Sequence, residues 1–196
     1  MAHLSTMEKL GSPAPSFSLT NFNSVVKGRT VSLLNFEEYF ALLVVFMCNH
    51  CPYVVHIRDS FLSFVSEYHE KGLGVVAINS NDVESYPDDS PEKMTEDAVK
   101  YSYQFPYLFD ESQEVAKAFR AACTPDFFLY DKKRNLVYRG QYDSSRPKNS
   151  EPVTGVDLRN ATNALLKNDI IASEQKPSMG CNIKWLKGRE PYYFAT

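Results

Sequence analysis

The stretch that decides the fold is residues 41–71, which read ALLVVFMCNHCPYVVHIRDSFLSFVSEYHEK. It opens with a nearly unbroken apolar run over residues 41–47, which is typical of a strand buried on both faces of a sheet. Pro52 suits the first turn of a helix, where a missing N–H costs nothing. Beyond it, apolar side chains recur every three or four residues, as in an amphipathic helix, at Val54, Ile57, Phe61, Val65 and Tyr68. The stretch therefore predicts a strand that turns directly into a helix.

Two cysteines, Cys48 and Cys51, occupy this turn and form a Cys-x-x-Cys pair. The thiolate is the reactive form of cysteine, and the free N–H groups and dipole at a helix N-terminus favour that anion. His50, between the cysteines, adds positive charge when it is protonated. In such settings a cysteine pKa falls from about 8.5 to about 3.5–7.5. The pattern predicts a redox-active pair, with Cys48 as the exposed attacking thiol and Cys51 as the resolving thiol under the first helical turn.

The alternative for this pair is one half of a structural zinc site, which needs two further ligands close by. The chain contains neither a second Cys-x-x-Cys nor a His-x-x-x-His. A Cys-x-x-Cys beside a βαβ pattern is typical of thioredoxin-like redox proteins. We therefore expect disulfide chemistry at this site, and neither a bound metal nor a cofactor.

Length and composition predict one domain with a core of its own, since 43% of the 196 residues are hydrophobic. The formal net charge is −3 with acidic and basic residues intermixed, which favours neither a nucleic-acid nor a membrane partner. The first residues lack the apolar core of a secretory signal, and no apolar run approaches the ~20 residues that span a bilayer. We therefore expect a cytoplasmic protein, where thiols stay reduced and a Cys-x-x-Cys is catalytic or sensing.

Around the central stretch, the apolar pattern predicts an α/β domain over residues 14–167. Residues 1–13 are expected to be a flexible lead-in, and residues 168–196 a tail that packs on the domain. Residues 79–82, Asn-Ser-Asn-Asp, follow a predicted strand, and they either face the cysteines or make an ordinary turn. The further predicted strands span 15–19, 30–33, 73–78, 107–109, 126–130 and 135–139, and the further helices span 91–103, 114–121 and 155–166.

Two phrases, CNHCP at 48–52 and CTPDFF at 123–128, resemble the thioredoxin superfamily. In that superfamily a cis proline lies beside the cysteine pair, which assigns Thr124 and Pro125 to the site. A peroxiredoxin-like, AhpC/TSA-type subfamily shares the phrases MCNHCPYV, VAINSND, FPYLFDE, CTPDFFLYD, VYRGQYD and PSMGCNIKW over residues 14–187. The resemblance implies a thioredoxin-like α/β fold: a central mixed β-sheet flanked by helices, with N-terminal β-strands and an inserted helix as in peroxiredoxins.

One departure from the peroxiredoxin pattern separates the activities that this resemblance implies. Peroxiredoxins carry Pro-x-x-x-Thr-x-x-Cys; with Cys51 at the peroxidatic position, Cys48 takes the Thr place and Val44 the Pro place. The arginine that such enzymes use has no match, because Thr124-Pro125 occupies its region. The resemblance thus favours a thiol–disulfide oxidoreductase that uses Cys48 and Cys51. The alternatives are a thiol-dependent peroxidase and a non-enzymatic module that senses oxidants or binds a metal.

Two further cysteines are candidate redox thiols, each with a plainer alternative. Cys123 precedes Thr124-Pro125, so the resemblance places it near the pair, as a third redox thiol or as a small buried residue. Cys181, in the tail, either reaches back over the site as a resolving cysteine or is an inert surface thiol.

The remaining expectations concern partners. Trp185 and the aromatic residues at 192–194 either pin the tail to the body or form part of a homodimer interface. Disulfide chemistry requires a disulfide-containing protein, or a small thiol or peroxide, as substrate. It also requires a reducing thiol system as electron donor.

Overall fold

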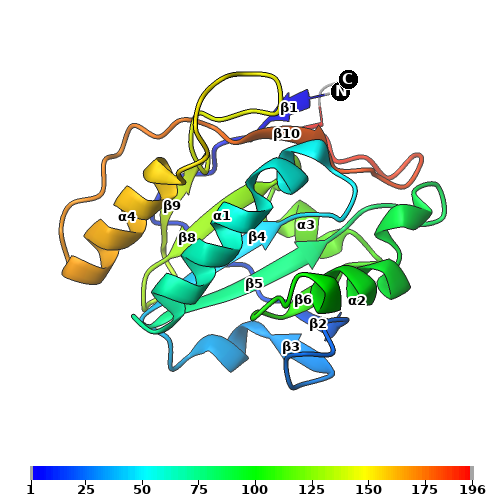
Figure 1. Cartoon of the computed structure of the whole chain (residues 1–196), viewed down its shortest axis with the longest axis horizontal. Helices are drawn as coiled ribbons and strands as arrows, with labels where there is room; N and C mark the ends of the chain where they lie inside the picture. The colour runs from blue at the N-terminus through cyan, green and yellow to red at the C-terminus, as the bar shows by residue number, and fades with distance from the viewer. Residues whose placement is uncertain (1, 195–196) are drawn as a thin grey trace.

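The computed structural model describes residues 2–194, and its centre is a seven-stranded mixed β-sheet (Figure 1). The strand order is β3-β2-β6-β5-β4-β8-β9. The strands span Ser18–Asn21 (β2), Thr30–Ser32 (β3), Ala41–Phe46 (β4), Leu73–Asn79 (β5), Tyr107–Phe109 (β6), Asp126–Tyr130 (β8) and Leu136–Gly140 (β9). β4 pairs parallel with β5 and antiparallel with β8, so the strand before the cysteine pair lies inside the sheet.

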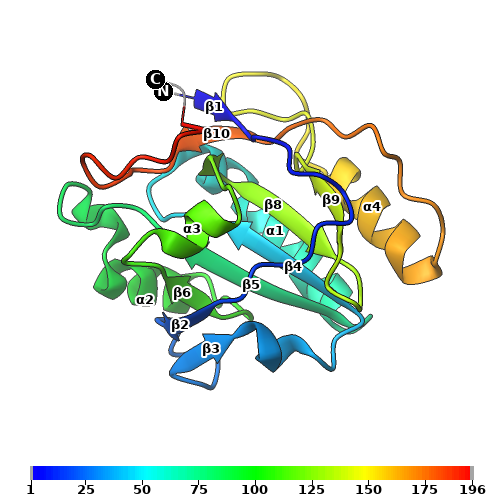
Figure 2. The same cartoon turned by 180° about the vertical axis from the view of Figure 1, so that it is seen from behind.

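Helices cover both faces of this sheet (Figure 1 and Figure 2). Helices α1, α2 and α4 lie on one face, and the short α3 lies on the other. The helices span Pro52–His69 (α1), Pro91–Lys100 (α2), Glu114–Ala118 (α3) and Val156–Lys167 (α4), with 3-10 helices at Leu33–Phe36 (η1) and Pro87–Asp89 (η2). Within residues 2–194, no helix has both the length and the apolar character that crossing a membrane requires.

The side chains of β4 alternate between two apolar clusters, one on each face of the sheet. Leu43 and Val45 join the cluster under α1, whereas Leu42 and Val44 join the cluster on the side of α3. All six residues of β4 are buried. Because burying one Leu or Val side chain stabilises the fold by about 1.5–3 kcal/mol, β4 is firmly held. The turn that carries the cysteines therefore starts from a fixed point.

A second, three-stranded sheet lies beside the end of α1 that carries the cysteines (Figure 1). Its strand order is β1-β10-β7, with bounds Ala2–Leu4, Met179–Asn182 and Cys123–Thr124. The sequence predicts neither β1 nor β10, and it assigns residues 2–4 to a flexible lead-in. Such short strands carry no periodic signal, because backbone pairing across long sequence distances defines them. The chain start, the tail and the segment before Pro125 therefore meet at one place.

The mixed sheet with flanking helices confirms the predicted thioredoxin-like α/β class. The predicted strands and helices of the main body are present, and the largest differences lie at the first strand and at the ends of two helices. The strand expected over 15–19 spans Ser18–Asn21. The helices expected over 91–103 and 114–121 end at Lys100 and Ala118. Ser102 and Arg120, which follow them, have left-handed backbone with φ of 54° and 53°, which no helix accommodates.

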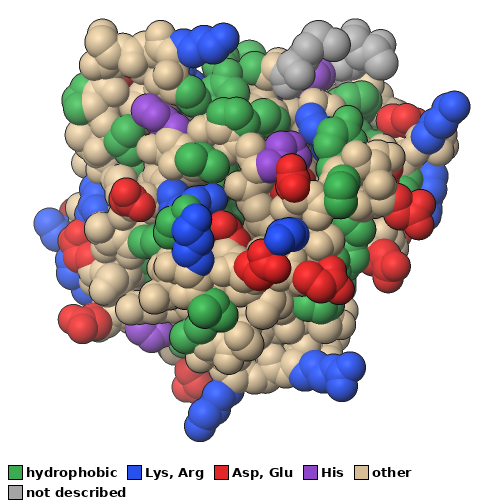
Figure 3. Space-filling view, turned by 45° about the vertical axis from the view of Figure 1, so that its right-hand side comes forward, with side chains coloured by type: hydrophobic (Ala, Val, Ile, Leu, Met, Phe, Trp, Pro, Cys, Tyr) green, Lys and Arg blue, Asp and Glu red, His purple; other side chains and the backbone are tan. Residues whose placement is uncertain are grey.

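The tail packs against the side of the sheet that carries α3. Trp185 is buried there, and the Tyr193 hydroxyl donates to the carbonyl oxygens of Ala116 and Ala121 at 3.3 and 3.2 Å. On the face shown in Figure 3, acidic and basic side chains are interspersed over the surface. That face therefore offers a charged partner no large field of one sign.

Candidate active site

The two cysteines of the pair lie where a strand ends and a helix begins. β4 ends at Phe46, Cys51 is the N-cap of α1, and Pro52 is the first helical residue. Cys48 is 1% exposed and Cys51 is 0% exposed. The expectation of an exposed Cys48 is therefore wrong, because its sulfur packs inward against Thr124 and Cys51.

Thr124 and Pro125 lie against this turn, and the peptide bond between them is cis, as predicted. The thiol of Cys51 donates to the carbonyl oxygen of Thr124 at 3.0 Å. The sulfur of Cys48 lies 3.7 Å from the Thr124 hydroxyl oxygen. Strand β7, which ends at Thr124, thus contacts both thiols of the pair.

The two thiols do not hold negative charge equally. The pKa of Cys51 is lowered, because the thiols of Cys181 and then Cys48 donate hydrogen bonds to its sulfur and outweigh the effect of burial. The pKa of Cys48 is raised, first by its hydrogen bond to Cys51, then by burial and by the carboxylate of Asp89. The carbonyl of Thr124 opposes part of the effect on Cys51, since it accepts only from the protonated thiol. The structure therefore favours Cys51, and not Cys48, as the thiolate of the reduced pair.

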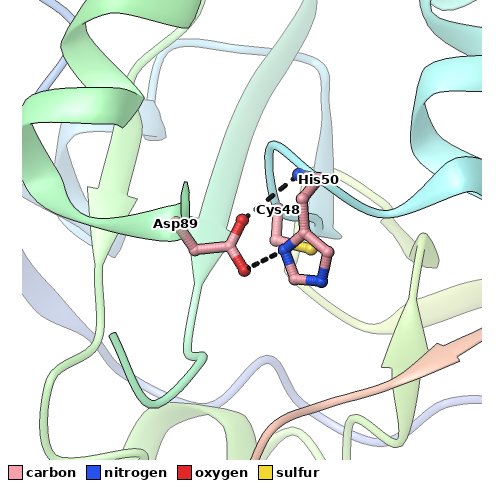
Figure 4. A group of neighbouring side chains, drawn as sticks. All are labelled: Cys48, His50 and Asp89. Atoms are coloured by element: carbon pink, nitrogen blue, oxygen red, sulfur yellow. Dashed lines mark hydrogen bonds and ion pairs between the residues drawn. The ribbon is translucent and has the colours of Figure 1, made fainter. Parts of the chain in front are cut away.

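His50 is held by a buried carboxylate, that of Asp89 (Figure 4). Its Nδ1 lies 2.6 Å from Asp89 Oδ2, with the His50 side chain 29% exposed and that of Asp89 0% exposed. The backbone N–H groups of Asn49 and His50 donate to Asp89 Oδ1 at 2.9 and 3.3 Å. A ring nitrogen of His50, an oxygen of Asp89 and the Cys48 sulfur all lie within 4.8 Å of one another. Asp89 therefore fixes the imidazole close to Cys48, with one side open to solvent.

Asp89 is the site residue that the sequence does not reveal, because its pattern predicts only the start of a helix. The side chain of Asn81 donates to Asp89 Oδ2 at 2.8 Å, and that of Asn79 donates to the Asp89 carbonyl at 2.7 Å. Of residues 79–82, Asn79 and Asn81 thus reach the cysteine turn through Asp89, whereas Asp82 makes an ordinary turn by accepting from the backbone N–H groups of Glu84 and Ser85. The signal for the two asparagines was their place at the carboxyl end of a strand parallel to β4.

Cys48, His50 and Asp89 are also the residues that offer a metal ion a set of ligands. Thiolate, imidazole and carboxylate are all ligands of Zn²⁺, and three of them match a site that keeps one coordination position open. The oxygens of Asp89, however, already accept hydrogen bonds from the Asn49 backbone and from Asn81. A metal ion would compete with those bonds for the same lone pairs.

The other two cysteines differ sharply in their surroundings. Cys123 is 0% exposed, and its sulfur faces the carbonyl oxygens of Pro125 and Ser178 at 3.6 and 3.9 Å. Burial raises the pKa of Cys123, as expected for a packing residue. Cys181 is half-buried, pairs with Thr124 beside the cysteine pair, and lowers the pKa of Cys51. Of the two candidates, Cys181 is therefore the one that favours the Cys51 thiolate.

Comparison with protein families gives a match over most of the chain. The AhpC/TSA family matches residues 10–139. The chain belongs to the AhpC/TSA family. At a coarse level, this membership supports a redox function of the thioredoxin superfamily and an oxidoreductase activity. The comparison with curated proteins gave no match.

Two solved structures are similar over nearly the whole AhpC/TSA-family chain. An uncharacterised conserved protein from Geobacillus kaustophilus is 49% identical, with a TM-score of 0.91 over 96% of this chain and 98% of that one. A hypothetical protein from Sinorhizobium meliloti is 48% identical, with a TM-score of 0.90 over 94% of this chain and 99% of that one. A thiol:disulfide interchange protein of the thioredoxin family from Chlorobium tepidum is 17% identical, with a TM-score of 0.60 over 82% and 99%. This last likeness shows the shared fold.

Proposed function

We propose that this protein is a thiol–disulfide oxidoreductase that exchanges disulfides through Cys48 and Cys51. One observation carries the proposal: both thiols lie at the start of α1 against the same residue, Thr124, with the Cys51 sulfur 3.0 Å from its carbonyl oxygen and the Cys48 sulfur 3.7 Å from its hydroxyl oxygen. Two thiols at this spacing can close one disulfide and pass it on by exchange. The partners are a substrate that contains a disulfide and a reducing thiol system that restores the dithiol.

The exchange takes two steps in which atoms and electrons balance. The Cys51 sulfur is 0% exposed, so β10 must first move away from it. The thiolate of Cys51 then attacks one sulfur of the substrate disulfide, and the other substrate sulfur leaves as a thiolate and takes up a proton. Cys48 then attacks the Cys51 sulfur of the mixed disulfide, and the second substrate sulfur leaves in the same way. The substrate disulfide is thereby reduced to two thiols, while Cys48 and Cys51 are oxidised to a disulfide. The reducing thiol system reopens that disulfide.

His50 is placed to assist the second step. The pKa of Cys48 is raised by its hydrogen bond to Cys51, so Cys48 attacks readily only if a nearby base takes its proton. A ring nitrogen of His50 lies within 4.8 Å of the Cys48 sulfur, a separation that one bridging water spans, and Asp89 orients the ring through its 2.6 Å contact. We assign His50 the role of base and Asp89 the role of positioning residue.

The reduction of insulin disulfides, measured above the background of the reductant alone, tests the proposed function. Cys51→Ser should lose the activity, and Cys48→Ser should lose the part that depends on the Cys48–Cys51 disulfide, because either change removes one sulfur of that disulfide. Cys123→Ser is the matched control and should keep it, because Cys123 packs against backbone carbonyls. Full activity in both Cys48→Ser and Cys51→Ser would rule the proposal out.

A thiol-dependent peroxidase is the second candidate, and the electrostatics of Cys51 favour it. Cys51 is the preferred thiolate, and it takes the peroxidatic position when the chain is laid on the peroxiredoxin motif. Against it, Cys48 and Val44 replace the Thr and Pro that peroxiredoxins use to bind peroxide. Stopped-flow reaction of the reduced protein with hydrogen peroxide separates the two activities. Rapid oxidation of Cys51 in both the wild type and Cys48→Ser would favour the peroxidase.

The third candidate, a module that holds a metal ion, has Cys48, His50 and Asp89 as its ligands. A zinc assay on the purified reduced protein tests it directly. Stoichiometric zinc that disappears in Asp89→Asn would favour metal binding over disulfide exchange. We expect insulin reduction without stoichiometric zinc, because the oxygens of Asp89 already accept from two backbone N–H groups and from Asn81, and His50 Nδ1 lies 2.6 Å from Oδ2.

A further inference from the structure

The thiol of Cys181 has no task in the Cys48–Cys51 exchange, yet Cys181 lies beside Cys51. Cys181 of β10 pairs with Thr124 of β7, and the carbonyl oxygen of Thr124 accepts from the Cys51 thiol at 3.0 Å. Cys181 also packs against the buried cluster that contains Cys48 and Cys51. The pKa of Cys51 agrees with this geometry, because the neighbouring Cys181 and Cys48 thiols both lower it. Cys51 therefore has two neighbouring thiols, one from its own turn and one from the tail.

This proximity is built into the fold, because β10 is the middle strand of the three-stranded sheet. On one side Cys181 pairs with Thr124 of β7, and on the other it pairs with Ala2 of β1. At Gly180 the strand comes so close to the site that a Cβ would lie 1.9 Å from the carbonyl oxygen of Thr124. Any residue other than glycine would push Cys181 away from Cys51.

The solvent exposure of the three thiols also singles out Cys181. Cys48 and Cys51 are 1% and 0% exposed, whereas Cys181 is half-buried. Strand β10 also occupies the edge of β7 beside Thr124, so an extended substrate segment cannot pair there while β10 is in place. Of these three thiols, Cys181 is therefore the one that an external disulfide or thiol can reach first.

We propose that Cys181 is a third redox thiol, which exchanges with the Cys48–Cys51 disulfide by forming a Cys51–Cys181 disulfide. In this step the Cys181 sulfur attacks Cys51 as a thiolate, the Cys48–Cys51 bond breaks, and the Cys51–Cys181 bond forms. Cys48 leaves as a thiolate and takes up the proton that Cys181 gave up, so the number of disulfides is unchanged and no further oxidant is needed. The step moves the disulfide from a buried pair to a half-exposed sulfur. It rests on the proposed function, since the Cys48–Cys51 disulfide is its starting point.

The test is to oxidise reduced full-length variants with oxidised glutathione, block free thiols with N-ethylmaleimide, and map disulfides by peptide mass spectrometry. Cys48→Ser should form the Cys51–Cys181 disulfide, at least tenfold in excess of any disulfide that includes Cys123. Cys181→Ser should form the Cys48–Cys51 disulfide, and Cys51→Ser should form neither. Thermal unfolding of each variant, with Cys48→Ala as a second replacement, shows that the fold is intact.

The outcomes separate this inference from the proposed function. In one outcome, Cys181→Ser forms the Cys48–Cys51 disulfide, while Cys51 and Cys181 stay free or glutathionylated in both Cys48 variants. This result would overturn the role of Cys181 as a third redox thiol and leave the proposed oxidoreductase function intact. If Cys181→Ser fails to close Cys48–Cys51, both proposals are overturned. Detection of the Cys51–Cys181 disulfide in Cys48→Ser, with Cys48–Cys51 in Cys181→Ser, supports both.

Discussion

Gly180 decides how closely β10 can lie against the active site. A Cβ at this position would lie 1.9 Å from the carbonyl oxygen of Thr124 and 2.5 Å from its carbonyl carbon. Ordinary contact begins at 3.4 Å. In Gly180→Ala the strand must therefore move until the new Cβ, which would start 1.9 Å from that oxygen, lies at least 3.4 Å from it. A backbone carbonyl held in a sheet cannot turn aside as a flexible side chain does. We therefore expect Gly180→Ala to separate β10 from β7.

The cost follows from the bonds that join the two strands. β10 pairs with β7 at Cys181–Thr124 and at Asn182–Cys123. If the change removes about two hydrogen bonds, each with a net value of about 0.5–1.5 kcal/mol, the loss is about 1–3 kcal/mol. Since about 1.4 kcal/mol is a factor of ten, the open form should become roughly 5 to 150 times more populated.

Alkylation of the reduced protein with N-ethylmaleimide, read out cysteine by cysteine, measures this opening. Cys51 is 0% exposed, so it should react only when β10 lifts, and its rate should rise by roughly 5- to 150-fold in Gly180→Ala. The wild type and Gly180→Ala are compared near pH 9, which is about the pKa of a free thiol. At this pH, a rise in the pKa of Cys51 caused by moving Cys181 away has less effect on the alkylation rate.

Gly188→Ala is the matched control for the loss of a tail glycine. Gly188 has a positive φ of 77°, and a Cβ there would have nothing within 4 Å, so its replacement adds local strain away from Thr124. Its Cys51 should react at the wild-type rate. The same rate in Gly180→Ala would show that β10 does not close the site, and would refute the reasoning.

Three other changes probe the site and its support. Asp89→Asn keeps the shape of the side chain but removes the carboxylate that raises the pKa of Cys48, so the Cys48 thiol should ionise at lower pH in an ultraviolet titration; an unchanged or higher midpoint would contradict this. His50→Gln should slow closure of the disulfide by roughly 10²-fold or more if His50 is the base, in rapid-mixing experiments that follow the mixed disulfide; an unchanged closure rate would exclude that role. Burial alone would raise the pKa of Asp143, but hydrogen bonds from the Ser145 hydroxyl and from three backbone N–H groups hold it below its ordinary value. A carboxyl group whose pKa is lowered in the folded protein stabilises the fold at pH values above its unfolded pKa of about 3.9. This stabilisation is lost as the pH falls through the folded pKa. Asp143→Asn should therefore be less stable than the wild type by about 1–3 kcal/mol at neutral pH. In urea unfolding this gap should narrow in acid, and a gap that stays constant with pH would contradict the assignment.

The parts of the site that the sequence predicts well are those set by local patterns. The run at 41–47 and the helical spacing after Pro52 place Cys48 and Cys51 on the turn between β4 and α1, where the structure has them. Both signals are strong because each element buries an apolar face of its own. The cis proline at Pro125 follows from the family resemblance and not from any local pattern.

The parts that the sequence misses depend on contacts between distant segments. Asp89 reaches the turn from a 3-10 helix, where its pattern indicates only a helix start. The sequence leaves two alternatives open for Cys181, because the strand that brings it to the site has four residues and no apolar face. The burial of Cys48 has the same origin, since the residue that lies on its sulfur, Thr124, belongs to another sheet. Periodicity reports which face of an element is buried, and it does not report which distant segment covers it.

Cys48, which replaces the Thr of the peroxiredoxin motif, removes part of the peroxide-binding pattern and also supplies the second thiol that disulfide exchange needs. In the AhpC/TSA frame Cys48 stands in the Thr place of the peroxiredoxin motif, so the group that would polarise a peroxide is here a second thiol that donates to Cys51. A thiol in that place stabilises the Cys51 thiolate by the same hydrogen bond, and it can then close a disulfide, which a hydroxyl cannot. Cys181, which reaches the site from the tail beside Thr124, also lowers the pKa of Cys51. If both proposals hold, a frame that in peroxiredoxins presents one sulfur to a small oxidant carries, in this chain, three sulfurs between which a disulfide can move.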